Sequence, residues 1–361
     1  MSRTLRPGWI VAPLLISAAC AEDISPDAVP VRVMTYNIGN PNVADTYYPL
    51  RLKDQDYEDY VGAQIRAKRA DIVFLQEVLP PTHCETFTES NPALTCWSSA
   101  NRPAAVQRIL GDDYSIACDA RQHVECVGVR TDFGTVAGVP PGGFVLDGAT
   151  TPPLPLDPCV YSAGECTEEL CDAESTVSAL TVKTAWGVLR VVHVHPNAAG
   201  KSASSGLYFG DRCRGLQLRQ VFDGLAGFGD VPLVTDDLTL VAGDFNVDPV
   251  RFIKEDELDL WTRHVGVGRR FQDFTPVDAN GAQHATNRET FGLAIDHVLA
   301  ERATGACQIW GADEFGTNPA NVDPLDKGFD WNSKPDGEYY ASRIDHFAIT
   351  CDFALDFTTS P

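Results

Sequence analysis

Basic residues are scarce in this sequence of 361 residues. There are 28 Lys and Arg against 50 Asp and Glu, which gives a formal net charge of −22 at pH 7. A surface with this charge repels polyanions at long range, which argues against tight, nonspecific binding to DNA. Nucleic acid is still allowed as a substrate, because divalent cations and a local basic patch can offset the repulsion.

Long apolar segments are absent apart from one near the N-terminus. The run from Trp9 to Ile16 follows Arg3 and Arg6 and precedes small residues that end at Ala21. It is too short to span a membrane as a helix, and this order of basic, apolar and small residues is typical of a secretory signal peptide. We therefore expect a signal peptide at residues 1–21 and a secreted, extracytoplasmic location for the rest of the chain.

Cys20 offers an alternative end to this signal. In a bacterial lipoprotein the cysteine after the signal is lipidated, and the signal here would then end before Cys20. Such signals usually carry Leu three residues before the cysteine, where this sequence has Ser17. The sequence therefore favours free secretion, with a lipid anchor at Cys20 as the second interpretation.

Close cysteine pairs such as C-x-x-C are missing, which argues against a zinc site. The chain has 11 cysteines, and setting Cys20 aside leaves an even number, which in an exported chain indicates disulfides. The sequence does not define their connectivity. The short-range pairs we consider are Cys84 with Cys96 and Cys118 with Cys126.

One domain is expected over residues 31–358, after an acidic, proline-containing linker at residues 22–30. Residues 118 to about 176 hold several cysteines and a Pro-rich run, so we expect an irregular, disulfide-linked insertion there. Alternating or continuous apolar runs predict strands, and apolar residues at i, i+3 and i+4 predict helices. The expected strands are Val31–Asn37, Asp71–Val78, Ser178–Thr184, Val188–His195, Leu240–Ala242, Phe291–Leu299 and Ile344–Phe353, and the expected helices are Tyr57–Lys68, Ala104–Leu110 and Asp211–Ala226.

Polar residues of a restricted set lie at the ends of these strands. A polar group beside a buried strand is costly unless it is paired or functional. Together the residue types suit one chemistry, the hydrolysis of a phosphoester. The set comprises Asn37, Glu77, His193 or His195, Asp244, Asn246, Asp296, Asp345 and His346.

Part of this set provides oxygen ligands for a hard cation. Glu77 and Asn37 supply a carboxylate and an amide, and Asp345 can add a second carboxylate. Mg²⁺ takes one or two carboxylates and keeps several waters. We therefore expect Mg²⁺ as the cofactor, with Mn²⁺ or Ca²⁺ as alternatives.

The other residues supply acid–base and hydrogen-bonding groups. His346 can take a proton from an attacking water if an acid holds its second ring nitrogen, and Asp296 is the expected acid. Asp244 and Asn246 lie two apart, so in extended backbone they point the same way. Asp244 can position the water, and Asn246 can donate to the phosphate oxygen that gains charge.

Five short motifs resemble those of the endonuclease/exonuclease/phosphatase superfamily, which includes pancreatic-type deoxyribonuclease, abasic-site endonucleases, bacterial sphingomyelinases and inositol polyphosphate phosphatases. The motifs follow the order of that superfamily and span nearly the whole chain after the signal. They are Met34-Thr35-Tyr36-Asn37, Gln76-Glu77-Val78, Gly243-Asp244-Phe245-Asn246, Ile295-Asp296-His297 and Ile344-Asp345-His346.

This resemblance implies a four-layer α-β-β-α sandwich with two facing mixed sheets, like deoxyribonuclease I, and a divalent-metal-dependent hydrolase. It implies that Glu77 and Asn37 are metal ligands. It also implies that Asp244 orients the water and that Asn246 contacts the phosphate. Asp345 and His346 resemble the terminal Asp-His pair, with Asp296 holding His346. The superfamily usually has Ser before that pair, whereas Arg343-Ile344 precede it here.

Two residues are candidates for the acid that protonates the leaving oxygen. His193 and His195 share one face of a strand, because they are two residues apart. The histidine of the superfamily typically lies two residues past a polar position near the strand end. This favours His195 and makes His193 the alternate candidate.

We therefore predict an exported, Mg²⁺-dependent phosphodiester hydrolase that acts as a monomer, with nuclease activity on extracellular DNA or RNA favoured. A sphingomyelinase-like phospholipase C, with phospholipid as its partner, or a phosphatase is the enzymatic alternative. A non-catalytic binding protein on the same fold is the alternative of another class.

Three further features are expected to be structural. His297 should be a packing or surface residue, because its side chain points away from that of Asp296 on a strand. The basic residues of the helix before the central strand, Arg212, Arg214 and Arg219, should form a solvated face. The aromatic residues between 310 and 340 should pack on the core.

Overall fold

The structure is a computed structural model that describes residues 25–38, 55–78, 99–102, 104–119, 124–146, 176–196, 210–224, 231–250, 253, 255–274, 276, 286, 293–310 and 346–358. Several sequence predictions lie outside these residues. They concern the signal peptide with Cys20, the pair Cys84–Cys96, residues 147–175 of the insertion, most of the aromatic segment, and Asp345.

The strands form two sheets. The first has seven strands in the spatial order β12 (Ala303–Trp310), β13 (Ala348–Leu355), β1 (Val29–Asn37), β2 (Ile72–Val78), β4 (Val124–Arg130), β3 (Tyr114–Asp119) and β6 (Phe144–Leu146). The second has six, in the order β10 (Gln272–Asp273), β11 (Asp296–Ala300), β9 (Thr239–Asp244), β8 (Val188–His195), β7 (Thr176–Thr184) and β5 (Gly134–Val136). Both sheets are mixed: β1–β2 and β8–β9 are parallel pairs, whereas β1–β13 and β7–β8 are antiparallel.

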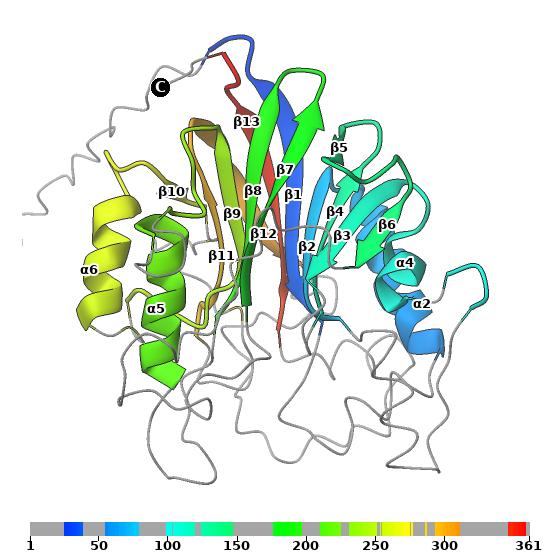
Figure 1. Cartoon of the computed structure of the whole chain (residues 1–361), viewed down its shortest axis with the longest axis horizontal. Helices are drawn as coiled ribbons and strands as arrows, with labels where there is room; N and C mark the ends of the chain where they lie inside the picture. Colours follow the sequence, from blue (N-terminus) through cyan, green and yellow to red (C-terminus); the bar gives the residue numbers. More distant parts are fainter. Residues whose placement is uncertain are drawn as a thin grey trace, which may run out of the picture.

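Two pairs of helices cover the outer faces of the sheets (Figure 1). The helices are α2 (Gln55–Lys68) and α4 (Ala105–Leu110) on the first sheet, and α5 (Gly210–Phe222) and α6 (Glu255–His264) on the second. A core of valine, leucine and phenylalanine residues from both sheets lies between them. These layers make the four-layer α-β-β-α sandwich, so the predicted fold class is confirmed.

The alternation of side chains explains the layers. In β1, Val31 and Val33 belong to the core between the sheets, whereas Met34 and Tyr36 belong to the core under α2 and α4. In β8 the pattern is the same, because Val191 faces the other sheet, whereas Val192 and Val194 face α5 and α6. Successive residues of a strand point to opposite faces, so strands buried on both faces read as continuous apolar runs.

The expectation of an irregular insertion from residue 118 is wrong for residues 124–146. Strand β4 lies inside the first sheet, between β2 and β3, and β5 and β6 extend the two sheets. Val127 and Val129 of β4 belong to the inter-sheet core. Cys126 and Gly128, on either side of Val127, weaken the apolar pattern, so the sequence suggested a disulfide-linked loop where the chain makes a central strand.

Two disulfides are present among the described cysteines. Cys118 and Cys126 join the paired strands β3 and β4, which confirms one of the pairs considered from the sequence. Cys307 and Cys351 join β12 and β13. No helix in the described part of the chain is both long and apolar enough to span a bilayer.

Candidate active site

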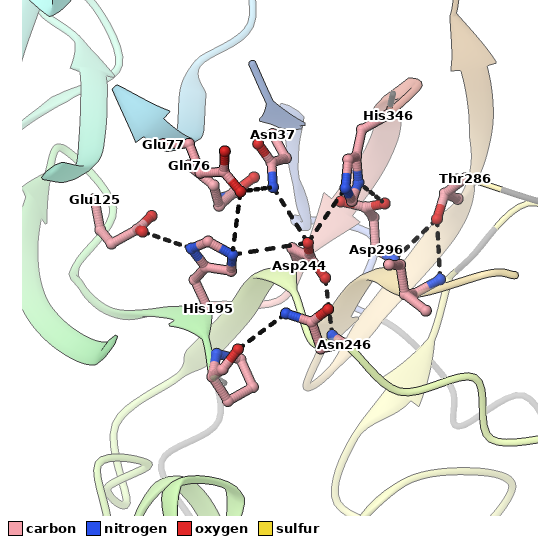
Figure 2. Close-up of polar contacts among 12 residues, drawn as sticks. Asn37, Gln76, Glu77, Glu125, His195, Asp244, Asn246, Thr286, Asp296 and His346 are labelled. Carbon is pink, nitrogen blue, oxygen red and sulfur yellow. Dashed lines mark hydrogen bonds and ion pairs between the residues drawn. The ribbon is translucent and has the colours of Figure 1, made fainter. Parts of the chain in front are cut away.

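Polar residues from both sheets meet at one end of the sandwich. Strands β1, β2, β8 and β9 end there, since the parallel pairs β1–β2 and β8–β9 bring their carboxyl ends to the same edge. Strand β11 begins at the same edge, with Asp296 paired opposite Asp244. Figure 2 shows the side chains of these elements pointing toward one another.

Asn37, at the end of β1, joins the two sheets at the centre of the site. Its Nδ2 donates to Glu77 Oε1 at 3.0 Å and to Asp244 Oδ2 at 3.2 Å. Glu77 comes from the first sheet and Asp244 from the second, and all three side chains are buried. The structure thus brings together three residues that the sequence predicted for one site.

A β-bulge points Glu77 into this site. Between Leu75 and Val78 the pairing of β2 with β4 shifts, so Gln76 and Glu77 together oppose Glu125. Leu75 and Val78 both face the helices α2 and α4, and in a regular strand the residue two after Leu75 would do the same. The bulge adds one residue, and Glu77 adopts a φ of 56°, so its carboxylate faces the other sheet instead. A non-glycine residue in this left-handed region is strained, which is common at functional sites.

His195 lies on one side of Asp244 and is held by Glu125. Its Nδ1 is 2.6 Å from Glu125 Oε1. Its Nε2 lies 3.8 Å from both Asp244 Oδ2 and Glu77 Oε1. Burial lowers the pKa of His195, but the charge of Glu125 and the hydrogen bond to it, with the charges of Asp244 and Glu77, raise the pKa to about 10. His195 is therefore an imidazolium that points Nε2 at the centre of the site.

Glu125 is one of the site residues that the sequence did not reveal. It lies on β4, within the segment expected to be irregular, and its side chain is buried. The signal that could have found it is alternation: Glu125, Val127 and Val129 share one face of a strand, so a carboxylate follows two core positions.

His193 does not reach the centre. Its Nε2 is 2.6 Å from Gln76 Nε2, which donates to it, and Gln76 also contacts Thr35 Oγ1 of β1 at 3.3 Å. Burial, together with the charge of His195, lowers the pKa of His193 to about 3. His193 is therefore a neutral acceptor between the sheets, and the geometry separates it from His195.

His346 lies on the other side of Asp244. Its Nδ1 is 2.9 Å from Asp296 Oδ2, and its Nε2 is 3.5 Å from Asp244 Oδ2. Thr286 supports this pair, since its Oγ1 accepts the backbone N–H of Asp296 at 3.0 Å and its carbonyl accepts that of Phe347 at 2.7 Å. The sequence predicted the His346–Asp296 contact, but it gave no sign of Thr286.

The turn after β9 is closely tied to its neighbours. A Cβ on Gly243, where φ is 147°, would lie 1.9 Å from the carbonyl oxygen of Val194, so only glycine fits before Asp244. Asp244 Oδ1 accepts the backbone N–H of Asn246 at 2.8 Å, and Asn246 has a φ of 51°. Asn246 Nδ2 donates to the carbonyl of Pro196 at 2.9 Å, which leaves its second amide hydrogen for a ligand.

His297 is a packing residue, one of the two roles expected for it. It is fully buried between Phe245 and Trp261, with ring centroids 5.4 and 5.0 Å away. Its Nε2 is 2.9 Å from the carbonyl oxygen of Val247. Its place is behind the turn, and it helps to fix the backbone after Asn246.

The charge of the site favours a divalent cation. Glu125 pairs with His195, so this pair is neutral when its imidazole is protonated, and Asp296 hydrogen-bonds to His346. The carboxylates of Glu77 and Asp244 remain, and Asn37 bridges them. Burial and the charge of Asp296 raise the pKa of Asp244, which shows how unfavourable another anion is here. Two buried negative charges side by side are offset by one dication.

Two sets of ligands are available for such a cation. Glu77, Asn37 and Asp244 form an all-oxygen set of the kind that Mg²⁺ prefers, once the Asn37 amide turns to present its oxygen. Asp244, Asp296 and His346 also place one ligand atom each within 4.8 Å of one another. In that second set Asp296 and His346 are hydrogen-bonded to each other, and a cation there would have to replace this hydrogen bond. The first set therefore fits a hard cation better. Asp345, the third expected ligand, lies outside the described residues.

Comparisons with known proteins give a likeness of fold. No protein-family model and no curated protein sequence matches the chain. Among solved structures, TDP2 from D. rerio in complex with a single-strand DNA product is 13% identical, with a TM-score of 0.49, over 90% of this chain and 98% of that one. The human Nocturnin catalytic domain is 14% identical, with a TM-score of 0.45, over 90% and 93%.

A third similar structure bears the name of the superfamily that the motifs resemble. It is an endonuclease/exonuclease/phosphatase family protein from Bacteroides thetaiotaomicron, 14% identical, with a TM-score of 0.45, over 93% of this chain and 99% of that one. Identities and TM-scores in this range do not define an activity. The site is therefore characterised by this chain's own geometry: two His–carboxylate pairs that flank a buried aspartate at one end of an α-β-β-α sandwich.

Proposed function

We propose that this chain is an exported, divalent-metal-dependent phosphodiester hydrolase whose substrate is nucleic acid. The observation that carries the proposal is the placement of two His–carboxylate pairs around Asp244. His195 and His346 approach the same oxygen, Asp244 Oδ2, from opposite sides (Figure 2), at 3.8 and 3.5 Å. In-line displacement at phosphorus needs a base on one side of the phosphate and an acid on the other, and this arrangement supplies both.

His346 is the base in this proposal. Asp296 holds its Nδ1, which leaves Nε2 as the atom that takes a proton from water. Asp244 Oδ2, 3.5 Å from this Nε2, accepts a hydrogen bond from the same water and orients it. The second amide hydrogen of Asn246 then donates to the phosphate oxygen that gains charge.

His195 is the acid. Its pKa of about 10 means that it carries a proton at neutral pH, and Glu125 keeps the imidazolium in place through Nδ1. The proton on Nε2 passes to the oxygen of the leaving group. His193 has no such role, because its low pKa keeps it neutral and its Nε2 is occupied by Gln76.

The cation belongs to the carboxylate side of the site. Glu77 and Asn37 would hold it, with Asp345 as a further ligand, and Mg²⁺ fits this oxygen-rich set, with Mn²⁺ or Ca²⁺ as alternatives. When bound, it neutralises charge on the phosphate. Export is supported by the two disulfides, Cys118–Cys126 and Cys307–Cys351, since such bonds persist in oxidising compartments.

A substrate panel tests the proposal. Plasmid DNA, RNA, sphingomyelin vesicles and an inositol polyphosphate are each incubated with the purified protein, with Mg²⁺ and with EDTA. We expect Mg²⁺-dependent cleavage of DNA or RNA. Cleavage of sphingomyelin alone would make the protein a phospholipase C, release of phosphate from the inositol ester would make it a phosphatase, and no hydrolysis would leave a binding protein.

A matched pair of variants shows whether the site is responsible. His346→Ala should abolish the cleavage. The control is His264→Ala, because His264 lies at the end of α6 and pairs with Asp223. Equal activity of both variants would exclude the proposed mechanism.

A further inference from the structure

Arg214 of α5 is fully buried, although the sequence suggested a solvated face for the basic residues of this helix. Its guanidinium makes two hydrogen bonds to Glu257 of α6, from Nε to Oε1 at 2.8 Å and from Nη2 to Oε2 at 2.9 Å. A buried charge pair is weak evidence for stability alone, because apolar residues of similar size are often as stable.

The remaining nitrogen of Arg214 reaches the active-site turn. Nη1 donates to the backbone carbonyl of Asn246 at 2.8 Å. Asn246 is one of the few non-glycine residues with a positive φ, 51°, in the described part of the chain. A residue in this conformation needs its neighbours to hold it there. The guanidinium, fixed by Glu257, supplies such a contact from outside the turn.

The conformation of Asn246 decides where its amide lies. With this φ the backbone N–H of Asn246 donates to Asp244 Oδ1, while its side chain donates to Pro196, which directly follows His195. A change of the Asn246 backbone therefore moves the Asn246 amide relative to both Asp244 and His195.

We propose that Arg214 is a positioning residue: through the carbonyl of Asn246, it keeps the amide of Asn246 aimed at the reacting phosphate. This inference rests on the proposed function. According to this inference, Arg214 and Glu257 of the outer helical layer affect the rate of the reaction as well as the stability of the protein.

A second, partly buried pair provides the control. Arg108 of α4 makes two hydrogen bonds to Glu58 of α2, at 2.6 and 2.8 Å, and its third nitrogen donates to the backbone carbonyl of Arg102 at 3.1 Å. This pair has the same geometry as Arg214–Glu257, but it joins the helices on the other sheet and its carbonyl partner is not a site residue.

The experiment compares Arg214→Lys with Arg108→Lys. Lysine keeps the charge but cannot bond to the carboxylate and the carbonyl in the same fork geometry. With bis(p-nitrophenyl) phosphate and Mg²⁺, Arg214→Lys should lower kcat by about 10- to 100-fold, with little change in KM, because small misplacements of catalytic groups cost this much. Arg108→Lys should lower Tm and leave kcat unchanged. A kcat of folded Arg214→Lys equal to wild type, or an equal loss in both variants, overturns the proposal.

A double mutant separates positioning from a general effect. If Arg214 acts through Asn246, then Arg214→Lys should lower kcat no further in an Asn246→Ala background. If the two losses multiply, Arg214 acts by another route and the proposal is wrong.

A measurement that needs no substrate distinguishes failure of the positioning role from failure of the proposed function. Hydrogen exchange of the backbone amides at 244–248 should be faster in Arg214→Lys than in wild type, and unchanged in Arg108→Lys. If wild type hydrolyses no diester, the proposed function fails, and the exchange measurement still decides the positioning role. Equal exchange in Arg214→Lys and wild type then overturns it.

Discussion

The two His–carboxylate pairs of this protein look alike but stand in different surroundings. His195 and Glu125 come from neighbouring parts of two sheets, and the imidazole has three carboxylates around it, those of Glu125, Glu77 and Asp244. His346 pairs with Asp296 near the starts of two strands, beside a backbone held by Thr286. The proposed function gives these two pairs opposite roles, and for His195 it is the neighbouring carboxylates that raise the pKa of the imidazole.

Removal of the divalent cation should lower the rate more than any change to either His–carboxylate pair, because both the acid and the base act on the same metal-dependent reaction. EDTA leaves the charges of Glu77 and Asp244 without compensation, and these repel the phosphodiester anion. We expect the rate of DNA cleavage to fall below detection and to return when Mg²⁺ is added in excess. An unchanged rate in EDTA would contradict the assignment of Glu77 and Asn37 as ligands.

Loss of the base should be the next largest effect, and it should not depend on the leaving group. His346→Ala should lower kcat by about 10³-fold both for DNA and for bis(p-nitrophenyl) phosphate, since general-base catalysis of this kind contributes about 10²- to 10⁴-fold. The measurement is steady-state kinetics on both substrates. A loss confined to DNA would make His346 the acid and reverse the comparison.

Loss of the acid should depend strongly on the leaving group. His195→Ala should lower kcat for DNA by about 10²-fold, but for the nitrophenyl ester by less than about fivefold, because nitrophenolate leaves without a proton. Equal losses on the two substrates would argue against His195 as the acid. Unchanged cleavage of DNA would point to His193 instead.

Substitutions of Glu125 and Asp296 should have a smaller effect, and they should change the pH profile differently. Glu125, followed by Asp244 and Glu77, raises the pKa of His195 to about 10, so the acid is protonated at neutral pH. Glu125→Gln removes that charge and lowers the pKa of His195, so the alkaline limb of kcat/KM should move to lower pH. Asp296→Asn should leave this limb in place. If both variants shift the alkaline limb equally, the assignment of His195 as the acid and His346 as the base is wrong.

Much of the fold could be predicted because most strands and helices show clear periodicity. The hairpin of β7 and β8 and the helix before β9 appear close to their expected bounds. The layer order was not visible in that periodicity, and it came from the resemblance of five motifs. The missed elements are β3, β4, β5, β6, β10, β12 and α6. In β4 and β12, cysteine and glycine interrupt the apolar patterns.

The site residues that lie at the ends of strands could be predicted from the sequence. The prediction failed for residues that reach the site only through tertiary contacts. Asn37 and Asp244 lie at strand ends, so their convergence follows from the parallel pairing of β1–β2 and β8–β9. Glu125 lies on a strand that was not predicted, and Arg214 lies on a predicted helix whose pattern did not show that this arginine is buried. Their roles depend on contacts across layers, which a single sequence does not encode in its local pattern.

The bulge at Gln76 and Glu77 also offers a diagnostic for other sequences. Deleting one residue there would restore regular pairing with β4, and the following residues would keep their places in the sheet. The strand would remain intact while the acidic side chain disappeared from the catalytic end or turned toward the helices. A homologous sequence with a one-residue gap at this point should thus encode a stable but inert protein, and the gap would reveal it before any assay.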